Sequence, residues 1–170
     1  LFAPQRLVLV GAQNAGKSTL FNHLLCRERV LTGPLPGLTR DPVVEATTLC
    51  GYPYEIVDTA GEGLASTALD AAAIVAGQAR RQAAHTLLLV DASRGPTDLD
   101  RRLRVDALLV IATKGDLDGP EWPVGSPCHL RVSCVTSAVA DVRNQLGELL
   151  RRVRQLPPAG RVGGIAALTH

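Results

Sequence analysis

Gly11-Ala12-Gln13-Asn14-Ala15-Gly16-Lys17-Ser18-Thr19 follows the apolar run Leu7–Val10 and precedes leucines at helical spacing. The stretch has the pattern GxxxxGKS, in which glycines let the backbone wrap closely and successive N–H groups face a phosphate. Lys17 is expected to reach the β- and γ-phosphate oxygens, and Ser18 to bind Mg²⁺. The N-terminus of the following helix adds positive charge to the same anion site. We therefore predict a phosphate-binding loop, with further nucleotide contacts from Gln13, Asn14, Ala15, Gly16 and Thr19.

Lysine is rare in this chain. Of the 18 Lys and Arg residues, only Lys17 and Lys114 are lysines. A compact ammonium and a flat guanidinium are not interchangeable, so lysine at these two positions supports specific roles for both.

Buried strands and amphipathic helices alternate along the chain. Strands are indicated by the apolar runs 7–10, 87–90 and 108–112, by a hairpin of 43–49 and 54–57 around the turn 50–53, and by a short run at 130–133. Helices are expected over 69–84 and 138–153, with about two turns over 97–104, whereas three prolines exclude a regular helix from 119–127. This order predicts a three-layer α/β fold of the P-loop NTPase type, with a mostly parallel six-stranded sheet and one antiparallel edge strand.

Composition limits the class of protein. The 170 residues are 46% hydrophobic and 3% aromatic, which is enough for one domain with an aliphatic core, and the net charge of +2 falls short of a nucleic-acid binder's basic footprint. We expect free thiols at Cys26, Cys50, Cys128 and Cys134, because their spacing fits no metal site.

Neither a bilayer-spanning run nor a signal peptide is visible, which predicts a cytoplasmic protein without membrane contact. Because the chain starts at Leu1 and contains no methionine, we expect it to be part of a longer polypeptide, with a nucleotide-binding domain over 1–156 and a linker or tail over 157–170.

Three later motifs each follow a predicted strand. In Asp58-Thr59-Ala60-Gly61, the aspartate can hold the water shell of Mg²⁺ and the Gly61 N–H can meet the γ-phosphate. In Thr113-Lys114-Gly115-Asp116, the carboxylate of Asp116 can accept two N–H groups of guanine while the Lys114 stem covers the ring. Backbone N–H groups of Ser133-Cys134-Val135 can contact the base oxygen. Each motif alone could be a strand-end turn, but their order after a phosphate loop favours a guanine nucleotide site.

These motifs, together with Pro36-Gly37-Leu38-Thr39-Arg40-Asp41, resemble a Ras-type GTPase domain of the TrmE–Era–EngA branch over Arg6–Leu156. Within the branch the chain is most similar to MnmE, which acts in tRNA modification, and next to Der, which acts in ribosome assembly. A long, weakly charged segment after DTAG favours MnmE. The resemblance implies Mg²⁺-dependent GTP hydrolysis by in-line attack of water, with Thr39 binding Mg²⁺ and Asn14 helping to bind K⁺.

The resemblance also implies partners. A homodimer of G domains is expected, and a tRNA-modification partner protein or RNA would be engaged through domains outside this chain. A module that binds nucleotide or protein without hydrolysis is the alternative of a different class.

Four positions depart from the branch. Thr113 replaces an asparagine, which predicts weaker bracing of the phosphate loop and low nucleotide affinity, and Cys134 and Val135 replace alanine and lysine beside the base. Glu62 replaces the glutamine of Ras-like enzymes. The resemblance to MnmE implies an acidic catalytic residue further along, and Asp70 lies at about that place; the alternative is that Asp70 is an ordinary first-turn carboxylate of a helix. Asn14 could likewise be only a turn residue.

Overall fold

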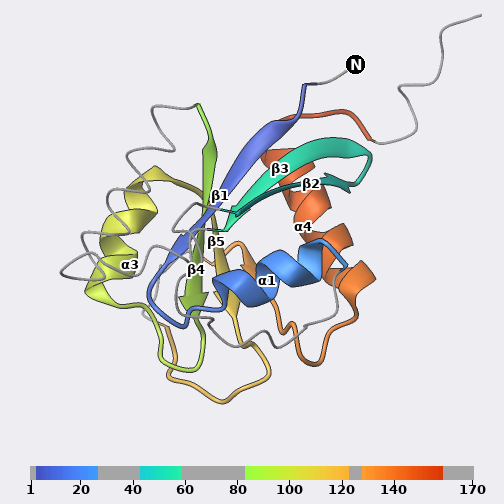
Figure 1. Cartoon of the computed structure of the whole chain (residues 1–170). Helices are drawn as coiled ribbons and strands as arrows, with labels where there is room; N and C mark the ends of the chain where they lie inside the picture. Colours follow the sequence, from blue (N-terminus) through green and yellow to red (C-terminus); the bar gives the residue numbers. More distant parts are fainter. Residues whose placement is uncertain (1–2, 27–42, 59–82, 123–127, 159–170) are drawn as a thin grey trace, which may run out of the picture.

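The computed structural model describes residues 3–26, 43–58, 83–122 and 128–158, which form a six-stranded sheet in the order β2-β3-β1-β4-β5-β6 (Figure 1). The strands are β1 (Gln5–Gly11), β2 (Val43–Leu49), β3 (Tyr52–Asp58), β4 (His85–Asp91), β5 (Ala107–Thr113) and β6 (Leu130–Arg131). The edge strand β2 is antiparallel to β3, and the other neighbouring pairs are parallel. This confirms the predicted sheet.

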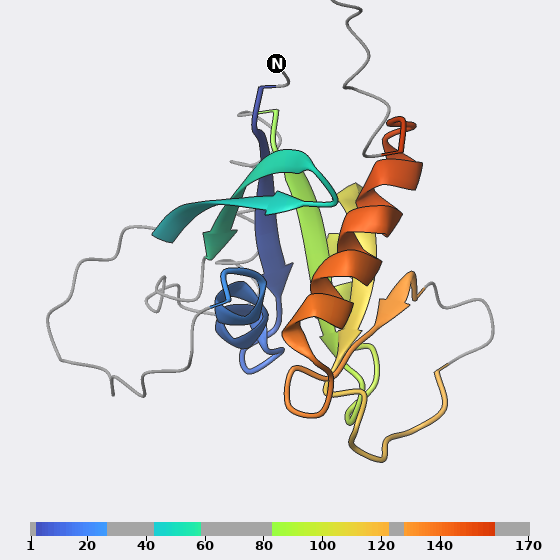
Figure 2. The same cartoon turned by 90° about the vertical axis from the view of Figure 1, so that its right-hand side faces the viewer.

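The described helices cover both faces of the sheet. They are α1 (Lys17–Leu24), α3 (Asp98–Leu103), which continues into a 3-10 turn at Arg104–Asp106, and α4 (Val139–Val153). In β1, Leu7 and Leu9 pack with α1 and α4 in one apolar cluster, whereas Val8 and Val10 pack with α3 in another. Alternation along a strand buried on both faces thus produces the predicted three layers, with α3 on one side of the sheet and α1 and α4 on the other (Figure 1). Figure 2 looks onto the side that α4 covers.

Strand ends extend beyond the apolar runs that predicted them. β1 includes the polar Arg6, which pairs with Glu55 of β3 at 2.9 Å. The hairpin turn is shorter than expected, because Cys50 and Gly51 alone connect β2 to β3, with φ angles of 47° and 81°. Positive φ angles at both residues are typical of a two-residue turn between twisted strands. Because the turn is this short, β3 already begins at Tyr52. At the other edge, β6 has two residues rather than the four expected.

The helix predictions have mixed outcomes. The prediction over 97–104 corresponds to α3, capped by Thr97, and that over 138–153 corresponds to α4. Most of the helix expected over 69–84 lies outside the described residues, but its expected end is wrong: Ala83 has a φ of 53° and stands in a turn. Residues 119–122 form no helix, as the prolines indicated. No described helix is long and apolar enough to cross a membrane.

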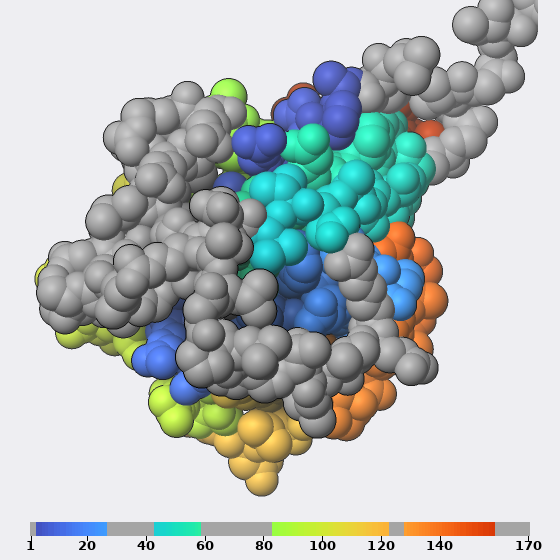
Figure 3. All heavy atoms as spheres, in the orientation of Figure 1, coloured from blue at the N-terminus to red at the C-terminus, as the bar shows by residue number. Residues whose placement is uncertain are grey.

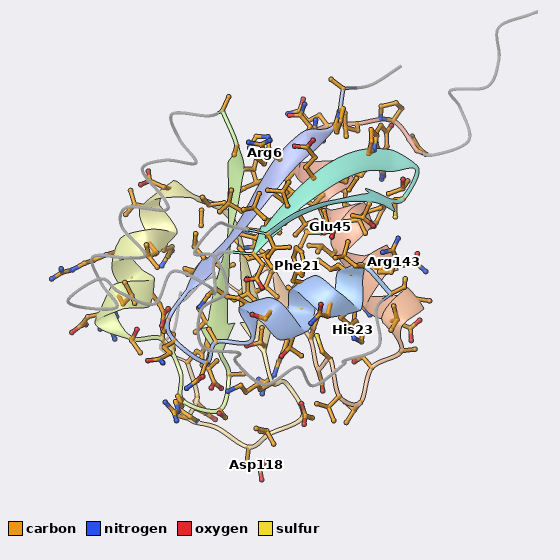
Figure 4. The ribbon with its side chains drawn as sticks, viewed as in Figure 1. Arg6, Phe21, His23, Glu45, Asp118 and Arg143 are labelled. Atoms are coloured by element: carbon orange, nitrogen blue, oxygen red, sulfur yellow. The ribbon has the colours of Figure 1, made fainter. Side chains whose placement is uncertain are left out.

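Arg143 connects α4 to two neighbouring elements of the fold (Figure 4). Its guanidinium donates hydrogen bonds to the carbonyl of Leu24 at the end of α1, to the hydroxyl of Thr47 at 3.2 Å and to the carbonyl of Thr48 at 2.7 Å. One side chain therefore joins α4, α1 and the edge strand β2, and it satisfies a carbonyl that the end of α1 leaves without a helical partner.

We predict that Arg143→Ala lowers the free energy of unfolding by about 1–3 kcal/mol, because it removes three hydrogen bonds between elements, two of them partly buried. Urea denaturation measures the change. Arg102→Ala removes the same charge from an exposed position on α3 and is the control. Equal stability of the two variants would contradict the connecting role of Arg143.

Candidate nucleotide-binding site

A pocket of about 630 Å³ opens beyond the carboxyl ends of β1, β4 and β5. This end of a parallel sheet is where ligands bind in open α/β folds. Among the described residues, three cations and no carboxylate line the pocket, and the full lining set is Gln13, Asn14, Gly16, Lys17, Ser18, Thr19, Arg94 and Lys114. The predicted phosphate loop thus faces the pocket, together with Lys114 and with Arg94, which sequence reasoning did not select.

Two residues of the phosphate loop, Gly11 and Asn14, are of types that suit the local backbone. A Cβ atom on Gly11 would lie 2.4 Å from the Leu89 carbonyl oxygen, so only glycine allows β1 and β4 to approach this closely. Asn14 has a φ of 62°, a left-handed conformation that asparagine tolerates better than most residues. This conformation supports the interpretation of Asn14 as a turn residue, and its side chain also lines the pocket.

Lys17 holds the loop from within. Its ammonium donates hydrogen bonds to the carbonyl oxygens of Gly11 at 3.1 Å and Ala12 at 2.7 Å. Burial lowers the pKa of Lys17, and the negative charges of Asp58 and Asp100 oppose that effect. An anion bound in the pocket would favour the charged form of the lysine further.

Thr113 contacts the phosphate loop directly, although its side chain is shorter than the asparagine expected there. Its side chain is buried at the end of β5, and its hydroxyl lies 2.7 Å from the Ala15 carbonyl oxygen and 3.2 Å from that of Val90. A hydroxyl has one proton, so it donates to one of these acceptors at a time, and the shorter distance favours Ala15. A shorter side chain therefore braces the loop at the position where an asparagine was expected.

Asp91 orients Lys114 and is a second residue to which sequence reasoning gave no role. One carboxylate oxygen accepts from the Lys114 ammonium at 2.6 Å, and the other accepts from the Ser93 N–H at 2.9 Å and hydroxyl at 2.6 Å. Burial acts to raise the pKa of Asp91, but these hydrogen bonds outweigh it and hold the pKa below its usual value. Asp91 is the last residue of β4, which pairs with β1. In the sequence it directly follows the apolar run 87–90, and this strand-end position was the signal that could have indicated a site residue.

The proposed base-binding residues lie at the ends of β5 and β6. Asp116 is exposed, and its loop is fixed by the Gly115 N–H, which donates to the Val132 carbonyl at 2.9 Å. Burial, and secondarily the charge of Asp116, raise the pKa of the Cys134 thiol to about 11. Cys134 is therefore neutral at physiological pH, and its partly buried side chain packs against the apolar core.

In the segment after β6, two backbone N–H groups donate hydrogen bonds to a side chain of the same segment. The buried Ser133 hydroxyl oxygen accepts from the N–H groups of Val135 at 3.2 Å and Thr136 at 3.1 Å. The Val135 N–H is thus already engaged by Ser133, and its expected contact with a base stays a prediction. The N–H of Cys134 makes no hydrogen bond among the described residues and remains the donor for that contact.

The expected Mg²⁺ ligands are only partly described. Ser18 is exposed on the pocket and Asp58 ends β3, close enough to Lys17 for their charges to interact. Thr39, Gly61, Glu62 and Asp70 lie outside the described residues. Across the described ranges, no group of three or more His, Cys, Asp or Glu could hold a metal ion.

Comparison with known proteins places this site in a family. A family model described as 50S ribosome-binding GTPase matches residues 6–114. A tRNA modification GTPase MnmE of Thermus thermophilus is 36% identical over 165 residues, which cover 97% of this chain and 36% of MnmE. GTPase Der of Thermosipho africanus is 40% identical over 123 residues, which cover 66% of this chain and 28% of Der. The chain thus spans about a third of the length of these relatives.

Solved structures agree on the fold. The G domain of the T. maritima FeoB iron transporter matches with a TM-score of 0.58 and 20% identity, over 90% of this chain and 100% of that domain. Era in complex with MgGDPNP and a segment of 16S ribosomal RNA matches with a TM-score of 0.60 and 21% identity over 92% of this chain and 58% of Era. The ordered motifs, the pocket that they line and the family match lead to one conclusion: the chain belongs to the 50S ribosome-binding GTPase family, in the TrmE–Era–EngA branch, with MnmE and Der among its relatives.

Proposed function

We propose that this GTPase domain is the GTP-dependent switch of an MnmE-like tRNA modification GTPase. The observation that supports this role over the Der alternative is coverage: several MnmE matches extend over 96–97% of the chain, whereas the match to Der extends over 66%, a coverage that some MnmE matches share. We propose a G domain over 1–156 and a cytoplasmic location, with contacts to RNA or a partner protein made by other domains.

At the phosphate end, Lys17 and the N–H groups of the loop hold the β- and γ-phosphates. Ser18 and Asp58, together with Thr39, are the proposed Mg²⁺ ligands, and hydroxyl and carboxylate oxygens are the donors that Mg²⁺ prefers. Bound Mg²⁺ would supply positive charge to the phosphate oxygens. The described residues that line the pocket include three cations and no carboxylate, which supports an anionic ligand of this kind.

Hydrolysis requires water to attack the γ-phosphorus in line with the bond to the bridging oxygen. The new oxygen–phosphorus bond forms as the bridging bond breaks, and GDP and inorganic phosphate leave. We propose that Asp70 positions this water and that Thr39 and Gly61 close over the γ-phosphate, so that the switch segments are ordered only with GTP bound.

Asn14 is the proposed K⁺ ligand. Asn14 is exposed and lines the pocket, and a cation bound by its side-chain oxygen would lie among the oxygens of the nucleotide. We further propose that the switch faces of two chains form a homodimer when K⁺ and a transition-state mimic are present.

Two alternatives remain testable. A Der-type role predicts co-sedimentation with ribosomal subunits, and a binding module without hydrolysis predicts GTP binding without phosphate release. Replacing the corresponding domain of Thermus thermophilus MnmE with this chain provides the test of the proposed role: the chimera should retain tRNA-modifying activity, and an inactive chimera with intact GTP hydrolysis would contradict it.

We predict that Asp116→Asn loses affinity for GDP and gains affinity for xanthosine diphosphate. The carboxylate accepts two N–H groups of guanine, whereas the extra carbonyl of xanthine needs a donor. The loss for GDP should be about 1.5–3 kcal/mol, the value of a hydrogen bond to a charged group. Calorimetry with GDP, ADP and xanthosine diphosphate measures this, and the neighbouring exposed Asp118→Asn is the matched control. Equal affinity of the native chain for GDP and ADP would refute the base assignment.

We predict faster GTP hydrolysis in KCl than in NaCl at the same ionic strength. Na⁺ is too small for the ligands that we propose for K⁺, and no glutamine follows DTAG to assist the reaction. Asn14→Ala should remove the difference between the salts. Phosphate release by the native chain and this variant measures the effect, and identical native rates in both salts would leave Asn14 as a turn residue only.

A further inference from the structure

Arg94 is a cation of the nucleotide pocket that has no assigned role. It follows β4 in the turn that leads to α3, it is exposed, and it lines the pocket together with Asn14 and Lys17. In Figure 3 the segment after β4 (yellow-green) lies beside the phosphate loop (blue) in the lower part of the view.

The backbone of Arg94 is held while its side chain is not. The N–H groups of Arg94 and Gly95 both donate to the Asp91 carbonyl, at 3.2 Å and 3.0 Å. The Asp91 carboxylate is in turn fixed by Ser93 and by Lys114. The Cα atom of Arg94 therefore has a defined position next to the phosphate loop, and its long side chain can adapt to a ligand.

The three cations of the pocket differ in their partners. Lys17 donates to carbonyls of its own loop, and Lys114 is paired with Asp91. The guanidinium of Arg94 makes no hydrogen bond or ion pair within the described part of the chain. Among the lining cations, Arg94 is thus the one whose donors are all free of contacts to described residues, whereas Lys17 and Lys114 each use part of their three donors within the chain.

We propose that Arg94 is a ligand of the nucleotide polyphosphate, supplied by the same chain: with GTP in the pocket, its guanidinium donates hydrogen bonds to oxygens of the β- and γ-phosphates. A planar guanidinium offers two parallel donors to a phosphate, which an ammonium does not. The inference rests on the proposed binding of GTP in this pocket. The residues that share the pocket with Arg94 are mainly those of the phosphate loop, which favours the phosphates over the base as its target.

The test compares Arg94→Ala with Arg102→Ala, which removes the same charge from an exposed position on α3 that does not line the pocket. Affinities for GMPPNP, GDP and GMP are measured by competition against a fluorescent GDP analogue, at fixed KCl and MgCl₂. Arg94→Ala should weaken GMPPNP binding roughly tenfold or more, as expected for a charged hydrogen bond, and should weaken GMP binding least. Arg94→Lys, which keeps the charge without the fork, should lie between Arg94→Ala and the native chain.

Two outcomes overturn the inference in different ways. If the native chain binds GMPPNP and Arg94→Ala differs from Arg102→Ala by less than about a factor of two, well below the effect of a charged hydrogen bond, the role of Arg94 is wrong and the proposed function stands. If the native chain binds no guanine nucleotide, the proposed function fails and this inference fails with it. Thermal unfolding of each variant shows whether it is folded at the temperature of the measurement.

Discussion

The hydrogen bond from the Thr113 hydroxyl to the Ala15 carbonyl, at 2.7 Å, is the contact on which the site depends. The phosphate loop contains left-handed conformations at Asn14 and Gly16, and its N–H groups can face an anion only while that shape persists. Thr113 fixes the loop from the end of β5, and Lys17 fixes it from inside through two carbonyls. Two independent groups therefore hold the loop in shape without a nucleotide, which reduces the ordering that binding must impose.

Asp91 extends this organisation from the phosphates toward the base. Its carboxylate pairs with Lys114, and its carbonyl holds the turn that carries Arg94. Lys114 belongs to the same loop as Asp116, so the base end and the phosphate end of the pocket share one largely buried anchor. Removal of the Asp91 charge would loosen Lys114 and the turn at Ser93 together, because the hydrogen bonds that lower the pKa of Asp91 come from these two residues.

The sequence allowed the fold and the phosphate loop to be predicted because both leave local patterns. The run Leu7–Val10 indicated a strand buried on both faces, and the glycines and lysine that follow it are the residue types that a phosphate loop requires. The contact of Thr113 with the phosphate loop could not be predicted from the sequence, since it depends on whether a short hydroxyl reaches a carbonyl of a distant loop. The pocket position of Arg94 was also missed, because it depends on how the turn after β4 packs beside the phosphate loop.

We infer that Thr113 keeps the phosphate loop, before nucleotide binds, in the shape that nucleotide binding requires. Thr113→Val keeps the shape of the side chain and removes the hydroxyl, which leaves the Ala15 carbonyl without this donor. The loop would relax to satisfy that carbonyl, and nucleotide binding would have to restore its shape. Calorimetric titration with GDP should show binding weakened by about 1–3 kcal/mol in a variant that is still folded. GDP affinity equal to that of the native chain would contradict the account.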